Sequence, residues 1–468
     1  MRVLLTAQQF LPGYSGGTEI LTRDTGLEMM ARGHEVHVLA VNPDAQGRSI
    51  DVSHEDYDYL GLKVRTLGLP RQRFRLDSIR DEYNNGLVAD HVRSYVNRIK
   101  PDAVHMFHLM RLSGSVIDVF RELGVPVVYT PTDFWAICVR ATLQKPSGEL
   151  STGPDEISSN CLECRSAEKV LSEEDLPDAA GKQEFYRKLA ERALARADDE
   201  PQNMAMLRAM LARTEFLRKR VNAVDAILAP TKLMQQMLTA NGINPDLVRV
   251  SRYGMDTSGF QDAKRPGPGE LRVGYMGTIH SRKGLHVLLK AFEKLPRSNG
   301  ATLRVCGNLE YYPDYAHEVY DLAAQDPRIN FAGSFPNEQM AAELGKIDVL
   351  VVPSTWYENT PLVIYSALVA GIPVVASNLG GMAEAVHHGE NGLLFQPGDP
   401  EDLARQLNRL IEEPGLLEKL GKNAGNVRSV EDSVDEMLDL YERLREKKVR
   451  ERAEGWPTSR NATSQPGT

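Results

Sequence analysis

The chain has 468 residues, of which 42% are hydrophobic and 25% are charged. Its 55 basic and 64 acidic residues give a formal net charge of −9, which argues against a general nucleic-acid-binding protein. No apolar run approaches the roughly 20 residues of a membrane-spanning helix. Four cysteines are too few for a disulfide framework in so long a chain. The length predicts two or three domains, and we expect a cytoplasmic protein.

The first third of the chain alternates short β-rich runs with helical patterns. Strands are predicted at Val3–Ala7, Val36–Ala40, Ala103–His105 and Val127–Thr130, and helices at Glu19–Ala31 and Leu87–Ile99. This alternation is typical of βαβ units and a parallel sheet. Residues 140–222 interrupt it with a Ser-, Gly- and Pro-rich loop and a charged stretch that we expect to be helical from about 179 to 221. A further strand at Ala226–Ala229 and a helix at Thr231–Ala240 then complete this half.

A second α/β series begins after Asp262–Gly269, which has the composition of a linker. Its predicted strands are Leu271–Tyr275, Thr302–Val305, Ile329–Phe331, Val349–Val352, Val374–Ala376 and Leu393–Phe395. These runs are mainly apolar rather than alternating, as in sheets covered by helices on both faces. We therefore expect an N-terminal domain of residues 1–262 with its insertion at 140–222, a C-terminal domain of residues 270–428, a helix at 429–448 and a disordered tail at 449–468.

Ligands of open α/β sheets bind at the carboxyl ends of the strands, so residues that directly follow strands are the first candidates. Gly16 and Gly17 follow the first strand and lead into a helix, where a backbone without side chains can approach an anion. A plain connecting loop would have the same composition. The Gly-x-Gly-x-x-Gly motif of dinucleotide-binding proteins is absent from this loop.

The stretch from Pro353 to Ala376 is the most informative in the chain. Asn359 or Thr360 can cap a helix, and Pro361 suits its first turn. The free N–H groups of that turn, from Leu362 onward, would point into the cleft and suit a diphosphate. Glu358 precedes them and could accept hydrogen bonds from sugar hydroxyls, although a simple capping carboxylate would look the same.

Another candidate loop follows the first strand of the C-terminal domain. It contains Gly277, Thr278, Arg282 and Lys283. A lysine at such a loop-to-helix junction can hold a phosphate as a point charge. Alone it would more often be a surface residue, but Gly16–Gly17, Lys283 and Glu358 all follow strand ends of two sheets expected to face each other.

Taken together, these features resemble family 4 of the retaining glycosyltransferases over nearly the whole chain. The resemblance rests on the following segments: Gly16–Glu19, Arg32–Val36, Thr130–Trp135, Tyr253–Asp256, Lys283–Gly284, Glu358, Gly371–Val375, Gly380–Glu384 and Asn391–Leu393. It implies the GT-B fold, in which two Rossmann-like domains face each other across a cleft, here with a helical insertion in the N-terminal domain. It also implies a nucleotide-sugar donor, UDP- or GDP-linked, in the C-terminal domain and an acceptor in the N-terminal one.

The same resemblance assigns roles to residues. Lys283 would neutralise the donor diphosphate, Glu358 would contact the donor sugar, and a histidine near His108 would face that sugar, so these three form the expected catalytic set. The expected donor-binding residues are Gly16, Gly17, Gly277, Thr278, Arg282, Lys283, Glu358, Asn359, Thr360, Pro361, Leu362 and Ser366. Thr132 and Asp133 are expected on the acceptor side. Positive groups and helix dipoles would stabilise the leaving diphosphate, with no cofactor or metal required.

Three positions depart from the family pattern. The second glutamate of the usual pair, eight residues after Glu358, is Ser366, which would hold the ribose hydroxyls more weakly. The usual arginine after the loop glycine is Thr278, and the nearby Arg282 is the candidate to replace its charge. The histidine that often precedes Asp133 is Thr132. These changes raise the alternative of a catalytically weakened nucleotide-sugar-binding or scaffolding protein, and a GT-B nucleotide-sugar epimerase is a further alternative.

The remaining candidates are histidines, cysteines and a basic stretch. His105 lies inside an apolar strand and is expected in the core. Cys138, Cys161 and Cys164 could supply three thiolates to a structural zinc ion, without an evident fourth ligand. Residues 71–75, with three arginines, could contact a membrane surface or an acceptor. The leading hypothesis is transfer of a sugar to a glycan, lipid-linked or small-molecule acceptor in polysaccharide or cell-envelope synthesis, without nucleic-acid partners.

Overall fold

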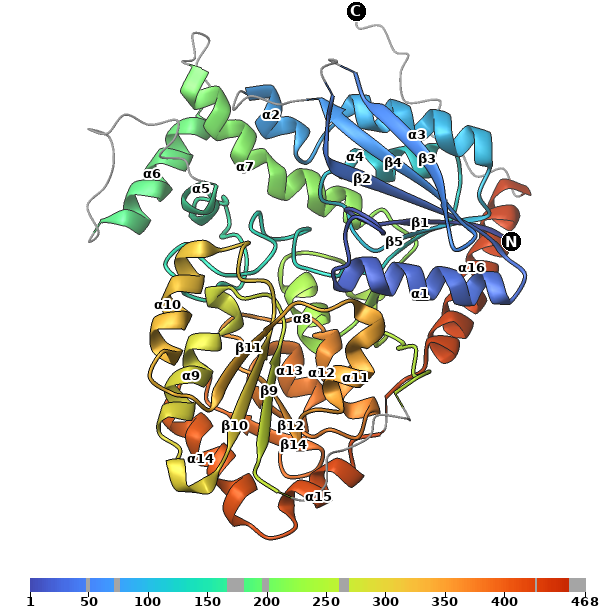
Figure 1. Ribbon diagram of the computed structural model, residues 1–468. Coiled ribbons are helices and arrows are strands. Elements are labelled where there is room, and N and C mark those ends of the chain that lie inside the picture. Colours follow the sequence, from blue (N-terminus) through green and yellow to red (C-terminus); the bar gives the residue numbers. More distant parts are fainter. Residues whose placement is uncertain are drawn as a thin grey trace, which may run out of the picture.

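The computed structural model describes residues 1–47, 51–70, 76–165, 181–195, 202–260, 269–425 and 427–453. Residues 262–268 of the predicted linker at 262–269, the basic stretch at 71–75 and residues 454–468 of the predicted tail at 449–468 lie outside these residues. Two parallel α/β domains stack along the long axis of the molecule (Figure 1). This arrangement confirms the expectation of two Rossmann-like domains.

The N-terminal sheet has the strand order β3-β4-β2-β1-β5-β6-β7-β8. Its strands are β1 (Arg2–Thr6), β2 (Glu35–Gly47), β3 (Ser53–Tyr59), β4 (Leu62–Pro70), β5 (Ala103–Met106), β6 (Val127–Tyr129), β7 (Ala226–Ala229) and β8 (Val248–Val250). All neighbours are parallel except β3, which pairs with β4 in antiparallel fashion at the edge. The sequence pattern predicts β1, β2, β5, β6 and β7, whereas β3, β4 and β8 were not predicted.

Helices cover both faces of this sheet. Helices α3 (Gly86–Ile99), α4 (Ser115–Glu122) and α8 (Lys232–Ala240) pack on one face, and α1 (Gly17–Ala31) packs on the other. The insertion contributes α5 (Asn160–Cys164), α6 (Lys182–Leu194) and α7 (Gln202–Val221), which share a small core with α2 (Leu76–Asp81). The expected helical stretch from 179 to 221 is thus divided between α6 and α7, with the segment 196–201 outside the described residues.

The C-terminal sheet has the strand order β11-β10-β9-β12-β13-β14, all parallel. Its strands are β9 (Arg272–Met276), β10 (Thr302–Cys306), β11 (Ile329–Gly333), β12 (Val349–Val352), β13 (Val374–Ser377) and β14 (Gly392–Phe395). Each was predicted to within a few residues. Helices α9 (Leu285–Glu293), α10 (Pro313–Ala323) and α14 (Pro400–Glu412) cover one face, and α11 (Met340–Leu344), α12 (Leu362–Val369) and α13 (Gly380–Ala385) the other. The short α15 (Leu416–Lys422) follows α14.

The last helix, α16 (Val430–Ala453), crosses back and packs beside α1 on the N-terminal domain (Figure 1). Its residues Val434, Met437 and Tyr441 are buried in the N-terminal core. It continues beyond 448, so residues 449–453 are helical where a disordered tail was expected. Among the described residues, none of the helices combines the length and apolarity that crossing a bilayer requires.

Candidate active site between the two domains

The strand orders place the candidate loops at the switch point of each sheet. In the C-terminal domain the chain turns in opposite directions after β9 and β12, which are adjacent, so the loops at 277–284 and 353–361 meet there. In the N-terminal domain β1 and β5 are adjacent in the same way, which brings together the loops at 7–16 and 107–114. Such points are where open α/β sheets bind ligands.

Glu358 and Lys283 meet at the C-terminal switch point. The Lys283 Nζ donates to Glu358 Oε1 at 2.7 Å, and the same oxygen accepts from Ser354 Oγ at 2.7 Å and from Trp356 Nε1 at 2.9 Å. The Glu358 side chain is 7% exposed, whereas that of Lys283 is 32% exposed. The carboxylate is therefore fixed by three donors, and the Lys283 side chain stays partly exposed.

Ser354 and Trp356 were not among the predicted site residues. Both lie within the stretch that the sequence analysis singled out, on either side of Thr355. Their spacing could have identified them, because Trp356 and Ser354 place an indole N–H and a hydroxyl group two and four residues before Glu358. A buried carboxylate needs such hydrogen-bond donors.

Two glycines allow this loop to be packed so closely. A side chain at Gly284, where φ is 73°, would overlap the Pro353 carbonyl group. At Gly381 a Cβ would overlap the Asn359 carbonyl group and lie 2.9 Å from that of Glu358. The Gly381 N–H also donates to the Glu358 carbonyl oxygen at 2.8 Å. The backbone that carries Glu358 is thus held from both sides.

Helix α12 begins one residue later than expected. Pro361 occupies the N-cap position, with no side-chain capping bond, so the prediction that Asn359 or Thr360 caps this helix is wrong. Thr360 Oγ1 is instead buried without a hydrogen-bond partner among the described residues. Ser366 is buried on α12, at the position expected to face the ribose.

Asn359 fails to cap α12 because its amide is used between the domains. Its Nδ2 donates to the Pro131 carbonyl oxygen at 3.0 Å, and its Oδ1 accepts from Thr231 Oγ1 at 3.2 Å. A second interdomain contact lies nearby: the two carboxylate oxygens of Glu384 accept from the N–H groups of Lys232 and Leu233 at 2.8 Å each. These bonds hold the start of α8 against the donor-side loops.

The glycine loop of the N-terminal domain approaches the same point. Gly16 is the N-cap of α1 and Gly17 its first residue. A Cβ at Gly17 would lie 3.5 Å from Leu362 Cδ1, at the start of α12. Two helix N-termini, one from each domain, therefore converge where Lys283 and Glu358 also lie, and the positive ends of the helix dipoles favour an anion.

Buried His108 pairs with the partly buried Asp133 on the N-terminal side. His108 Nε2 and Asp133 Oδ2 are 2.7 Å apart, and the Met110 N–H donates to His108 Nδ1 at 3.0 Å. Because Nδ1 accepts a hydrogen bond, the ring hydrogen lies on Nε2 and is donated to Asp133. Both ring nitrogens are thus in use. Thr132, beside Asp133, donates its hydroxyl hydrogen to the Phe107 carbonyl oxygen at 2.9 Å.

His105 is a core residue, as predicted. Its side chain is fully buried, with Nε2 2.7 Å from Thr130 Oγ1 and Nδ1 2.5 Å from the Tyr441 hydroxyl group. Burial lowers the pKa of His105 to about 3, so the ring stays neutral in the folded protein. Its hydroxyl partner on α16 fixes this last helix to the N-terminal sheet.

The other predicted donor-side residues line the loop after β9. Gly277 and Thr278 are exposed, and the Thr278 carbonyl oxygen accepts from the Tyr275 hydroxyl group at 2.9 Å. The Arg282 guanidinium group lies 5.3 Å from the centre of the Trp356 ring, and the Lys283 Nζ lies 5.5 Å from it. Burial is the main cause that lowers the pKa of Arg282, and the positive charge of Arg140 adds to it.

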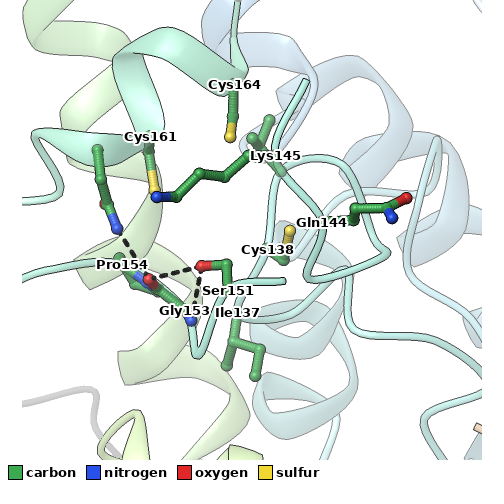
Figure 2. Close-up of a pocket in the computed structure, with 11 residues that line it drawn as sticks. Ile137, Cys138, Gln144, Lys145, Ser151, Gly153, Pro154, Cys161 and Cys164 are labelled. Atoms are coloured by element: carbon green, nitrogen blue, oxygen red, sulfur yellow. Dashed lines mark hydrogen bonds between the residues drawn. The ribbon is translucent and has the colours of Figure 1, made fainter. Parts of the chain in front are cut away.

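The three cysteines of the proposed zinc site line one pocket in the insertion. Figure 2 shows Cys138 on one wall and Cys161 and Cys164, from α5, on the other. Burial raises the pKa of the Cys161 thiol to about 12 and that of the Cys164 thiol to about 11. Among the residues that the structure describes, no group of three or more His, Cys, Asp or Glu side chains is placed to hold a metal ion. The zinc site stays a prediction.

Comparison with known proteins now decides the family. Residues 16–254 match the model of the glycosyl transferase 4-like domain, and residues 260–427 match that of glycosyl transferases group 1. The chain belongs to the glycosyl transferase 4-like family. The resemblance noted from the motifs is thereby confirmed.

The curated relatives of this glycosyl transferase 4-like chain are named for different enzymes. A glycogen synthase of Mycobacterium tuberculosis (strain CDC 1551 / Oshkosh) is 31% identical over 182 residues, which are 38% of this chain and 43% of that protein. A D-inositol 3-phosphate glycosyltransferase of Rhodococcus jostii (strain RHA1) is 30% identical over 230 residues, which are 45% of this chain and 50% of that protein. The matched regions thus span about half the length of these curated relatives.

Solved structures share the fold over almost the whole chain. Anabaena Alr3699/HepE in complex with UDP and glucose gives a TM-score of 0.61 at 18% identity, covering 94% of this chain and 99% of that one. Sucrose-phosphate synthase from Thermosynechococcus elongatus gives a TM-score of 0.63 at 18% identity, covering 95% and 98%. At this level of identity the likeness establishes the fold. The GT-B architecture predicted from the sequence is confirmed.

Proposed function

We propose that this protein is a retaining glycosyltransferase that moves a sugar, of hexosyl type, from a UDP- or GDP-linked donor to a hydroxyl group of a glycan, lipid-linked or small-molecule acceptor. One observation carries the proposal. The buried Glu358 carboxylate and the Lys283 ammonium group lie together at the C-terminal switch point, facing the glycine loop of the other domain. The family membership and the UDP bound to the structural neighbour Alr3699/HepE support it.

The charges around this point suit a departing nucleoside diphosphate. Its negative charge would be met by the Lys283 ammonium group and by the N-termini of α12 and α1, all of which are fixed before the reaction. Glu358, held by three donors, would accept hydrogen bonds from sugar hydroxyls through its other oxygen. The positive charges come from the chain itself, so we propose that transfer requires no metal ion.

The state of His108 bears on how the acceptor loses its proton. Since both of its ring nitrogens are hydrogen-bonded, His108 has no free position for a proton in this arrangement. We assign the proton to the leaving group: the acceptor oxygen bonds to the anomeric carbon as the bond from that carbon to the diphosphate breaks, and the acceptor proton passes to the departing phosphate oxygen. Attack and departure on one face retain the anomeric configuration.

Turnover of a donor panel tests the proposal. The purified protein is offered UDP- and GDP-linked sugars one at a time, while melting temperature and nucleotide release are recorded with and without sugar and polyol acceptors. We expect one donor to raise the melting temperature and to release nucleotide. The absence of any donor binding would refute the transferase proposal. Binding without nucleotide release would favour the scaffolding alternative. Conversion of the donor into its epimeric nucleotide sugar, followed by NMR of the same samples, would favour the epimerase.

Two variants connect this activity with the site. Lys283→Ala and Glu358→Ala should each abolish most of the activity, because one removes the charge beside the diphosphate and the other the contact with the sugar. Lys290→Ala is the matched control, since Lys290 lies on the exposed side of α9, two turns from Lys283. We also propose a cytoplasmic site of action with contact to a membrane surface, for which the basic stretch at 71–75 is the candidate segment.

A further inference from the structure

Three of the four cysteines line one pocket, and none of the roles above uses them. Cys161 and Cys164 come from α5, and Cys138 comes from the loop that follows β6 (Figure 2). The space between them measures about 20 Å³. One water molecule needs roughly 10–15 Å³ on the same scale. The pocket therefore has room for one water molecule or one ion among three thiol groups.

A buried positive charge lies beside these thiols. Arg213, on α7, is 3% exposed, and its guanidinium group lies 4.6 Å from the centre of the Trp135 ring and donates to the Trp135 carbonyl oxygen. Its Nε is buried without a hydrogen-bond partner among the described residues. Burial lowers the pKa of Arg213 to about 10, so it stays charged at neutral pH. The Arg213 charge and the thiols of Cys138 and Cys161 are close enough to influence one another.

The charges around Arg213 do not balance. Glu82 Oε1 lies 3.8 Å from Arg213 Nε, but the same carboxylate pairs with Arg165 at 2.8 Å, and the Arg165 side chain is also buried. Other charged groups that act on the thiols are either exposed or paired with an opposite charge: Arg140, Lys145, Asp155 and Glu163. Two arginines and one glutamate thus leave one positive charge beside the pocket. A buried charge is costly unless an opposite charge is near.

A divalent cation bound by three thiolates would supply the missing charge. Three negative sulfur atoms around a doubly positive ion leave one negative charge, which balances the buried excess. A monovalent cation would leave two negative charges, and three protonated thiols would leave none. Thiolates are soft ligands, and zinc is the divalent ion that structural thiolate sites in proteins hold most often.

We propose that Cys138, Cys161 and Cys164 bind one zinc ion, with a water molecule as the fourth ligand. Three S–H bonds break, three S–Zn bonds form, and the three protons pass to the solvent. Ser151 also lines the pocket, but its hydroxyl group is bonded to the Gly153 backbone at 3.2 and 3.3 Å, so the fourth place of a tetrahedral site is left to water.

Binding requires the sulfur atoms to turn toward one another. As the described side chains stand, the three thiols line the pocket without forming a coordination shell. A cysteine redirects its sulfur by rotation about the Cα–Cβ bond, between staggered positions of similar energy. The bound ion would join α5 of the insertion to the loop after β6, which also carries Asp133. Its role is structural and goes beyond the proposed function, because the ion takes no part in sugar transfer.

Cobalt binding to the full chain tests the proposal. The protein is reduced, stripped with a chelator and titrated with Co²⁺, which gives a thiolate-to-cobalt charge-transfer absorption in the near ultraviolet, and then with Zn²⁺. We expect one equivalent of Co²⁺ to produce this absorption and Zn²⁺ to abolish it.

The cysteine variants assign the ligands. Loss of a group that only orients a metal ligand weakens metal sites about 10- to 100-fold, so Cys138→Ser, Cys161→Ser and Cys164→Ser should each weaken binding at least about 100-fold. Cys306→Ala, which replaces the fourth cysteine, on β10 of the other domain, is the matched control and should bind Co²⁺ as wild type does.

A measurement on wild type alone decides the matter even if a variant fails to fold. Alkylation by N-ethylmaleimide is followed for each cysteine by peptide mass spectrometry, and zinc should slow it at Cys138, Cys161 and Cys164. Wild type without the charge-transfer absorption would overturn the proposal. The same conclusion would follow from a serine variant that is folded and binds Co²⁺ as tightly as wild type, or from equal alkylation of the three thiols with and without zinc.

Discussion

Replacing Lys283 by methionine removes the positive charge that pairs with Glu358 at the proposed donor site. The methionine keeps most of the volume of the stem and takes away the ammonium group. Glu358 would keep its bonds from Ser354 Oγ and Trp356 Nε1, at 2.7 and 2.9 Å. Two consequences follow, one for stability and one for nucleotide binding, and the two are measured separately.

The stability effect should be small. Removing one partner of a fully buried ion pair costs about 3–5 kcal/mol, but exposed pairs contribute only about 0–1 kcal/mol. Lys283 is 32% exposed and Glu358 7%, and two neutral donors remain, so we expect a loss of about 1–2 kcal/mol. Denaturant unfolding of wild type and Lys283→Met measures this difference.

The effect on nucleotide binding should be larger. A hydrogen bond to a charged group contributes about 1.5–3 kcal/mol, which corresponds to a roughly 10- to 150-fold weaker Kd for UDP or GDP. Titration calorimetry measures the affinity, with Lys290→Met on the exposed side of α9 as the control. A Lys283→Met protein that binds the nucleotide as tightly as the Lys290→Met control would refute the assignment of Lys283 to the diphosphate.

Three further outcomes are expected. Gly381→Ala should lower the free energy of unfolding by about 1–3 kcal/mol and abolish most of the turnover, because its Cβ would displace the backbone that carries Glu358. Gly425→Ala is the control, since its Cβ would meet nothing within 4 Å and should change neither quantity. Equal unfolding curves for the two variants would contradict this prediction. Burial lowers the pKa of His105 from 6.5 to about 3 in the folded protein. The stability that comes from its neutral ring is therefore fully present above pH 6.5 and is lost as the pH falls toward 3. Between about pH 7 and pH 5, wild type should lose about 2 kcal/mol more unfolding free energy than His105→Gln, because only wild type has this ring to protonate. An equal loss in both proteins would refute the buried neutral ring. Glu384→Ala should remove both interdomain bonds to α8 and increase the radius of gyration in small-angle scattering, whereas an unchanged scattering curve would show that these bonds do not hold the domains together.

The sequence predicted those parts of the fold whose signal is local. The parallel strands of the C-terminal domain are short, mainly apolar runs, and each was found because helices cover both faces of the sheet, although β10 and β11 also carry Arg304 and Asn330. The edge strand β3, Ser53–Tyr59, is largely exposed and carries charged residues, so its composition does not distinguish it from a loop. It forms a strand because it pairs with β4, and the spacing of apolar residues in the sequence does not reveal this pairing.

The candidate site shows the same division. The positions of Lys283 and Glu358 after β9 and β12 followed from the strand pattern, and their meeting followed from the topology of parallel sheets. The capping role expected of Asn359 was wrong because Pro131 and Thr231, more than a hundred residues earlier in the chain, use its amide. Helix-capping preferences are read from neighbouring residues, so they cannot account for distant groups that bind the same amide.

The central claim is that a nucleotide sugar binds at the C-terminal switch point with its diphosphate facing the N-terminal domain. A crystal structure with the nucleoside diphosphate that gives the largest rise in melting temperature tests it most directly. The account predicts the diphosphate beside the Lys283 Nζ and the first turn of α12, with Glu358 at the place of the sugar. A diphosphate bound elsewhere on the chain, with Lys283 still paired to Glu358 and no ligand beside them, would contradict it.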